Sequence, residues 1–244
     1  MLEDGIKDII KKYKGFFGVY ICTDNGIEIK LNTETVFKSA SLIKLFILLS
    51  IDERNLKEKI KVREEDIVGG GGVLDKLHSG LELTVKDLAV LMITLSDNMA
   101  TNILIDYLGM DRINRNILKN GFEKTVLQRK MLDIKAAEQG MDNYTTAEEI
   151  MKVLKILYEK PIFLNMLLEQ QINFKLSLYL SENTDFKFAH KTGELVNVEH
   201  DVGRLYYKDR YIDVVVMTKN LPDNSEGIKL QNEIGEYLKK VIAQ

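Results

Sequence analysis

Segments with the pattern of β-strands occur only near the two ends of this chain of 244 residues. Near the amino end, two runs rich in aromatic and β-branched residues flank the hairpin signal Asp24-Asn25-Gly26. Three more runs lie near the carboxyl end, and Lys208-Asp209 form a tight turn between the last two. The predicted strands are 16–22, 27–32, 186–192, 202–208 and 210–219. Because short connections join antiparallel neighbours, the pattern predicts one antiparallel sheet built from both ends of the chain.

The middle of the chain, from about residue 50 to residue 180, has the periodicity of helices. Thr84 is placed to cap one of these helices, and Pro161 is placed to begin another. Gly109 and Gly121 are placed to end two more. The predicted helices are 2–13, 39–50, the segment after Thr84, 99–108, 111–119, 145–160, the segment after Pro161, and 225–242.

This order of elements predicts an α+β fold with two lobes. Residues 1–50 and 181–244 form the first lobe, a five-stranded antiparallel sheet flanked by the two terminal helices. Residues 51–180 form the second, an all-helical lobe, and the two lobes make a single unit. Because ligand sites favour the boundary between such parts, we expect a site at the seam.

Composition excludes several classes of protein. The 37 acidic and 34 basic side chains give a net charge of −3, which provides no overall attraction to nucleic acid. Cys22 is the only cysteine, so the chain has no internal disulfide and no cysteine-based metal site. The three histidines leave little material for a histidine-rich site. We therefore expect no metal, no cofactor and no nucleic-acid partner.

No segment has the pattern of a membrane span or a signal peptide. The most apolar run covers only residues 42–51 and contains Lys44, whereas a bilayer span needs about 20 residues. The amino end carries acidic residues early and has no long apolar core. We expect a soluble, cytoplasmic monomer that acts on a small molecule; a secreted protein whose leader has been removed would show the same pattern.

Lys44 does not fit the apolar helix 39–50 in which it stands. A buried lysine is costly unless it has partners or loses its proton. Ser41 lies one helical turn earlier, and a lysine of lowered pKa can take the proton from a serine hydroxyl. The ordinary explanation is a lysine whose ammonium reaches water. Such pairs are also common, since Lys38 and Ser50 occur in the same neighbourhood.

Ser96, Asp97 and Asn98 lie at the junction of two strongly apolar helices. The ordinary explanation is the end of one helix followed by the cap of the next, which suits all three residue types. The functional interpretation makes Ser96 a proton relay, and Asn98 a side chain that holds an amide of the substrate.

Lys191, Thr192 and Gly193 end a predicted strand. The ordinary explanation is a solvated strand end followed by a glycine turn. In the functional interpretation, Lys191 and Thr192 bind a carboxylate of the substrate. An open strand edge at this point would also pair with an extended substrate.

The three motifs have more weight together than each has alone. SLIK at 41–44, SDN at 96–98 and KTG at 191–193 occur in the order that characterises class A β-lactamases and penicillin-binding proteins. The chain resembles this family of penicillin-recognising serine enzymes over most of its length. Further segments that carry the resemblance are 69–74, 87–109, 142–150 and 190–194. The resemblance implies a β-lactamase/transpeptidase-like fold, in agreement with the two lobes.

The resemblance also implies the residues that catalyse the reaction. Ser41 is the nucleophile that becomes acylated, and Lys44 is its base or proton shuttle. Ser96 passes a proton to the departing amine nitrogen, and Lys191 shapes the electrostatic field of the site. No metal takes part.

The residues implied to bind the substrate are Asn98, Thr192, Gly193 and Glu194. Asn98 holds the acylamino side chain, while Thr192 and Gly193 act with Lys191 on the carboxylate. The backbone amides of Ser41 and Glu194 form the oxyanion hole. Members of the family usually carry a small residue near this second amide, whereas Glu194 and its neighbour Leu195 are bulky.

Four glycines at 69–72 lack the lysine and hydroxyl pair of a phosphate-binding loop. We expect this run to form a flexible flap at the mouth of the site.

The resemblance predicts a serine hydrolase that opens the amide bond of β-lactams through an acyl-enzyme, an activity linked to antibiotic resistance. Class A enzymes carry a loop glutamate that activates the deacylating water. Counting back from Thr145 places Met131 at that position. Asp133 and Glu138 are candidate substitutes, although loop carboxylates are usually solvated.

The missing glutamate leaves an alternative open. General base catalysis contributes about 10²–10⁴ to a rate, so without it acylation proceeds while deacylation stalls. The alternative is a D,D-peptidase-like or esterase-like hydrolase, or a penicillin-binding sensor with weak deacylation.

Overall fold

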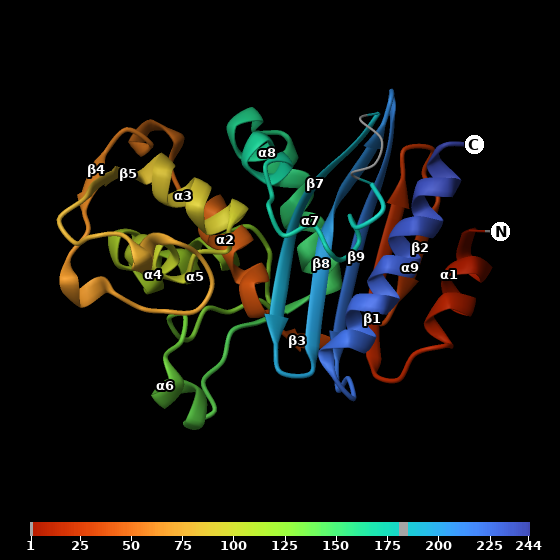
Figure 1. Cartoon of the computed structure of the whole chain (residues 1–244), viewed down its shortest axis with the longest axis horizontal. Helices are drawn as coiled ribbons and strands as arrows, with labels where there is room; N and C mark the ends of the chain where they lie inside the picture. Colours follow the sequence, from red (N-terminus) through yellow and green to blue (C-terminus); the bar gives the residue numbers. More distant parts are fainter. Residues whose placement is uncertain (1, 181–184) are drawn as a thin grey trace.

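The centre of the computed structural model, which describes residues 2–180 and 185–244, is a five-stranded antiparallel sheet (Figure 1). The strand order is β2–β1–β9–β8–β7. The strands are β1 Phe16–Thr23, β2 Glu28–Leu31, β7 Phe186–Leu195, β8 Val198–Tyr207 and β9 Arg210–Lys219. Every residue of β1 is paired with one of β9, so the sheet joins both ends of the chain, as predicted.

The two terminal helices, α1 (Leu2–Ile10) and α9 (Asn224–Ile242), cover one face of the sheet (Figure 1). Successive side chains of a strand point to opposite faces. In β9, Val214 and Val216 accordingly belong to the core beneath the terminal helices, whereas Val215 and Met217 belong to the core on the opposite face. Both faces of the sheet are therefore buried at its centre.

Helices of the middle segment cover the opposite face. Among them, α7 packs on β1 and β9, and α8 packs on β7. The helices are α2 Ile43–Leu49, α3 Val85–Thr94, α4 Asn98–Leu108, α5 Met110–Lys119, α6 Ile134–Glu138, α7 Ala147–Tyr158 and α8 Pro161–Leu168. One hydrophobic core joins α2, α3, α4 and α7 to the sheet, so the two parts of the chain share a core. The predicted division into lobes stays a prediction, and residues 181–184 at its edge lie outside the described residues.

The middle segment also contains three short strands that the periodicity did not reveal. The strands β4 (Lys59–Lys61) and β5 (Glu82–Thr84) form a hairpin, and β6 (Tyr144–Thr146) pairs with β3 (Val36–Lys38). Each has three residues, too few for an alternating pattern to be distinct. The β3–β6 pair fixes the chain just before Ser41 against the end of the loop that contains Met131.

Most of the helix starts follow the predicted signals. Thr84 caps α3 and forms a capping box with Asp87, and Pro161 is the first residue of α8. The predicted helix 145–160 begins slightly later, at Ala147, because Thr146, the last residue of β6, is its cap and accepts from the Glu149 amide. The predicted helix 39–50 begins as a 3₁₀ turn before it becomes α2. The 3₁₀ helices are η1 Ala40–Leu42, η2 Glu53–Asn55, η3 Glu64–Asp66 and η4 Leu74–Lys76.

No helix in the described part of the chain combines the length and the apolar character that crossing a bilayer requires.

Candidate active site

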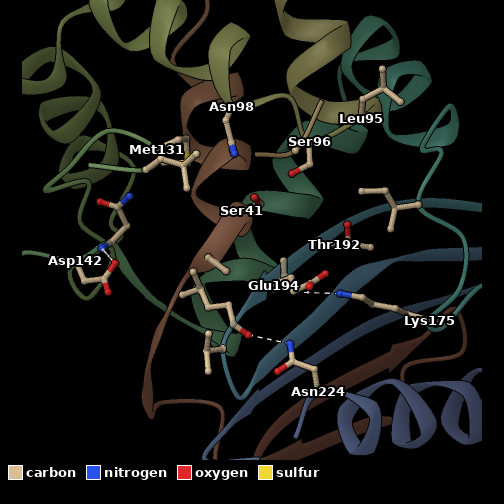
Figure 2. Close-up of a pocket in the computed structure, with 18 of the residues that line it drawn as sticks. Ser41, Leu95, Ser96, Asn98, Met131, Asp142, Lys175, Thr192, Glu194 and Asn224 are labelled. Carbon is tan, nitrogen blue, oxygen red and sulfur yellow. Dashed lines mark hydrogen bonds between the residues drawn. The ribbon is translucent and has the colours of Figure 1, made fainter. Parts of the chain in front are cut away.

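A pocket of about 710 Å³ lies between η1, the α3–α4 connection, the loop before β6 and the edge strand β7 (Figure 2). Six of the predicted site residues line it: Ser41, Ser96, Asn98, Thr192, Gly193 and Glu194. The three motifs, far apart in the sequence, therefore meet in one place. Among residues 2–180 and 185–244, no cluster of histidine, cysteine, aspartate or glutamate is arranged to hold a metal ion.

Ser41 is presented by a tightly held turn. Ala40, just before it, has φ = 47°, a left-handed conformation that a non-glycine residue seldom adopts. The Ser39 amide donates to the carbonyl of Asn143 (2.8 Å), and His200 Nε2 contacts the carbonyl of Lys38 at 2.9 Å. Burial lowers the pKa of His200 to about 4, so its neutral ring donates to Lys38 while Nδ1 accepts from a backbone amide. The hydroxyl of Ser41 faces the pocket (Figure 2).

Lys44 is fully buried, which overturns the ordinary explanation of an ammonium that reaches water. Its Nζ donates to the Ser96 carbonyl (2.7 Å), to Ser96 Oγ (3.1 Å) and to Asn98 Oδ1 (3.0 Å). Burial lowers the pKa of Lys44 to about 7, although the carboxylate of Asp97 opposes the shift. Near neutral pH this lysine is therefore present both with and without its extra proton, as a general base requires.

Ser96 connects the two buried lysines. Its Oγ also accepts a hydrogen bond from Lys191 Nζ (3.1 Å), which in addition donates to the Thr192 carbonyl (2.9 Å). Burial, and then the charges of Lys44 and Lys175, hold the pKa of Lys191 well below its usual range. Ser96 itself has φ = 54°, and such conformations persist where the surroundings enforce them. The geometry allows a proton to pass between either lysine and the hydroxyl.

Asp97 holds the wall of the pocket together. It caps α4 through the amide of Ala100 (2.9 Å), so the capping role expected of this motif is present in its central residue. Its second oxygen accepts from the amides of Val73 (2.7 Å) and Leu74 (2.8 Å). The Asn98 amide donates to the carbonyl of Gly71 (3.0 Å), a pocket-lining residue. The glycine run expected at the mouth of the site is thus bonded to the Ser96–Asn98 turn.

The loop before β6 is closed by an ion pair that the sequence interpretation missed. Arg129 contacts Asp142 Oδ1 through Nη2 (2.8 Å), and Lys38 contacts Oδ2 (3.0 Å). Burial raises the pKa of Asp142, but Lys38, the Asn143 amide and Arg129 outweigh it and leave that pKa below its ordinary value. Asn143 Oδ1 also accepts from the amides of Gln128 (2.8 Å) and Arg129 (3.1 Å).

Met131 occupies the part of this loop that faces the pocket (Figure 2). Its amide donates to Asn102 Oδ1 (2.8 Å), and its carbonyl accepts from Asn102 Nδ2 (3.1 Å), so its backbone is fixed. Asp133 caps α6 through the amide of Ala136 (3.0 Å), and Glu138 is exposed at the end of α6. Neither carboxylate belongs to the residues that line the pocket. The loop therefore presents a thioether to the pocket, and no carboxylate, from this position.

Lys175 is a further pocket residue that the sequence interpretation missed. It forms a buried ion pair with Glu199, and Asn224 Nδ2 donates to the same carboxylate (2.6 Å). The available signal was a single lysine within the mostly apolar segment 172–180, an anomaly similar to the one that singled out Lys44.

A buried serine–lysine network on an α+β scaffold of this kind defines a class of serine hydrolases, and comparison with known proteins specifies the family. The model of the beta-lactamase enzyme family matches residues 1–242, and the chain belongs to that family. The predicted resemblance and fold class are thereby confirmed.

Individual relatives agree with this assignment. A solved β-lactamase from Sphaerobacter thermophilus is 30% identical, with a TM-score of 0.87 and coverage of 99% of this chain and 97% of the other. The β-lactamase BRO-1 of Moraxella catarrhalis is 23% identical over 99% of this chain and 83% of its own length. A point mutant of PBP-A, solved as an acyl-enzyme complex with penicillin G, is 24% identical, with a TM-score of 0.86 and coverage of 99% and 96%.

Replacement of Gly72 by alanine tests the packing of the glycine run. Gly72 has φ = +108°, and a Cβ there would lie 2.2 Å from Asp97 Oδ2, so we expect Gly72→Ala to lower the free energy of unfolding by about 2 kcal/mol or more. The control is Gly69→Ala, whose Cβ would meet only Asp75 Oδ2, at 3.9 Å. Urea unfolding measures both; equal stability of the two variants would contradict a packed glycine run.

Proposed function

We propose that the protein hydrolyses β-lactams through a covalent acyl-enzyme on Ser41. The observation that carries this proposal is the buried amine of Lys44, bonded to Ser96 and Asn98, with a pKa of about 7. Membership of the beta-lactamase enzyme family supports it, as does the penicillin G acyl-enzyme formed by the PBP-A mutant.

In the proposed acylation step, each polar group has the role that the family resemblance implies. Neutral Lys44 takes the proton from the Ser41 hydroxyl, which attacks the lactam carbonyl. The amides of Ser41 and Glu194 stabilise the oxyanion, and removal of one such donor typically costs about 10²–10³ in rate. Ser96, bonded to both buried lysines, delivers a proton to the lactam nitrogen as the C–N bond breaks.

In this proposal the substrate is held by residues on both sides of Ser41. Asn98 binds the acylamino group, and Thr192 and Gly193, with Lys191, bind the carboxylate. The proposed partner is therefore a small anionic amide, bound by a monomer without a cofactor. The net charge of −3 gives no reason to expect nucleic acid as a second partner.

Deacylation is the slow step of this proposed cycle. A water that attacks the acyl-enzyme needs a general base, and at the loop position where class A enzymes carry the glutamate this chain has the thioether of Met131. The carboxylate of Asp142 also lines the pocket, but it is paired with Arg129 and Lys38. A thioether accepts no proton at neutral pH. We therefore expect deacylation to be slower than acylation, so that the acyl-enzyme accumulates. A long-lived acyl-enzyme is expected both of a slow hydrolase and of the alternative, a penicillin-binding sensor.

Acylation of Ser41 is measured directly by intact-mass spectrometry. Incubation with benzylpenicillin should add the mass of one penicillin to the protein and then release penicilloate, whereas Ser41→Ala should form no adduct, because it lacks the nucleophile. An adduct on Ser41→Ala would reject the assignment of the nucleophile. A wild-type adduct that never turns over would favour the sensor.

The pH dependence of acylation reports on Lys44. Only the neutral amine can accept the serine proton, so the second-order rate constant should rise with pH below about 7 and level off above it, in line with the lowered pKa of Lys44. Intact-mass spectrometry of samples quenched at set times, between about pH 5 and pH 9, gives the dependence of the acylation rate constant on pH. A rate that keeps rising towards the ordinary pKa of lysine would contradict the role of this residue.

Insertion of a carboxylate at residue 131 tests the cause of slow deacylation. We expect Met131→Glu to accelerate deacylation by about 10²–10⁴, the contribution typical of a general base, with little change in acylation. Met131→Gln has nearly the same shape without the basicity and should leave deacylation slow. Equal effects of the two substitutions on the decay of the acyl-enzyme would show that the thioether is not what limits it.

A further inference from the structure

The buried ion pair of Lys175 and Glu199 lies directly behind the stretch of β7 that borders the pocket. Both side chains are 1% exposed. Lys175 Nζ also donates to the carbonyl of Gly193 (3.2 Å) and to that of His200 (3.4 Å), which are paired residues of β7 and β8. Asn224 donates both to Glu199 and to the Leu195 carbonyl (2.9 Å). The ion pair therefore connects α9, β7 and β8 at one point.

The contacts of Lys175 all lie within the protein. Its Nζ donates to two backbone carbonyls and forms an ion pair with one carboxylate. Although Lys175 is part of the pocket wall, its ammonium is directed to the protein's own carbonyls and its side chain is 1% exposed. Its charge is also balanced by Glu199 within the same buried site.

The carbonyl that Lys175 holds shares a peptide group with the amide that faces the reaction. The Gly193 carbonyl and the Glu194 N–H belong to one planar trans peptide, so they point in opposite directions. β7 is an edge strand, and Glu194 lies at the border of the pocket. A hydrogen bond from a charged donor fixes the tilt of the carbonyl and polarises the N–H on the other side of the plane.

We propose that Lys175 is a positioning residue for catalysis: its ammonium, held by Glu199, orients and polarises the Glu194 N–H that stabilises the oxyanion. This inference rests on the proposed acylation of Ser41. It explains why an ion pair is retained in a buried position where well-packed apolar side chains are often at least as stable. Asn224 completes the arrangement, because it fixes the carboxylate that in turn fixes Lys175.

Because Glu199 is the counterion of Lys175, the variants that test the role of Lys175 must take Glu199 into account. Burial raises the pKa of Glu199 while Lys175 and Asn224 lower it, so loss of Lys175 alone would leave a carboxyl group buried without its main partner. Lys175→Met therefore needs a companion, Lys175→Met combined with Glu199→Gln, which leaves no unpaired charge. Lys187→Met is the control, because Lys187 is exposed on β7, the strand whose Gly193 carbonyl Lys175 contacts.

The first measurement is the stretching frequency of the acyl-enzyme ester in isotope-edited infrared spectra, with benzylpenicillin labelled with ¹³C at the lactam carbonyl. A strong oxyanion hole lowers this frequency. We expect a shift to higher frequency in both Lys175 variants, none in Lys187→Met, and acylation at least tenfold slower. An unshifted band in the folded double variant would overturn the proposal.

The second measurement distinguishes positioning from direct recognition of the carboxylate. If Lys175 acts through the Glu194 amide, acylation by benzylpenicillin and by its methyl ester should slow by the same factor in the double variant. A loss confined to the free acid would show instead that Lys175 binds the substrate carboxylate, and would refute the inference. Failure of the wild-type protein to form any adduct would count against the proposed function itself, before the variants are compared.

Discussion

The burial of the Lys44 amine is the constraint on which the rest of the site depends. An apolar helix contains this amine only because three oxygen atoms surround it, and all three come from Ser96 and Asn98 rather than from its own helix. The α3–α4 connection must therefore lie against α2, with Ser96 in a left-handed conformation. Lys191 approaches the same hydroxyl from the sheet. One desolvated amine thus sets the distance between the helical part of the chain and β7.

Three carboxylates stabilise the backbone segments that form the pocket. Asp97 holds the glycine run through backbone amides, Asp142 closes the loop with Arg129, and Glu199 balances Lys175. None of the three is proposed to touch the substrate, yet each fixes the backbone that presents a reacting group. Polar networks of this kind are costly when incomplete and rigid when satisfied. We therefore attribute the rigidity of the pocket to residues that support its backbone without contacting the substrate.

At Met131 the backbone of the site is in place, but the side chain cannot act as a general base. Asn102 fixes the backbone of this residue, and Asp142 closes the loop around it. The loop backbone is thus fixed at a position where the side chain is not a base. In the proposed mechanism, acylation depends on residues of η1, α2 and β7, and deacylation depends on the loop before β6. For this reason a change in the loop can slow one half of the reaction without disturbing the other.

Local patterns in the sequence were sufficient for the antiparallel sheet, most of the helices and the three motifs, because periodicity and capping depend on near neighbours. The anomaly of a lysine in an apolar helix also singled out Lys44, which the structure shows to be buried. Only the tertiary structure decided that Lys175 pairs with Glu199, that Arg129 closes the loop on Asp142, and that β3 pairs with β6. Each of these contacts joins segments separated in the chain, and a charged residue taken alone looks the same whether it is solvated or paired. The fold was therefore encoded in patterns along the chain, whereas the support of the site depended on distances across it.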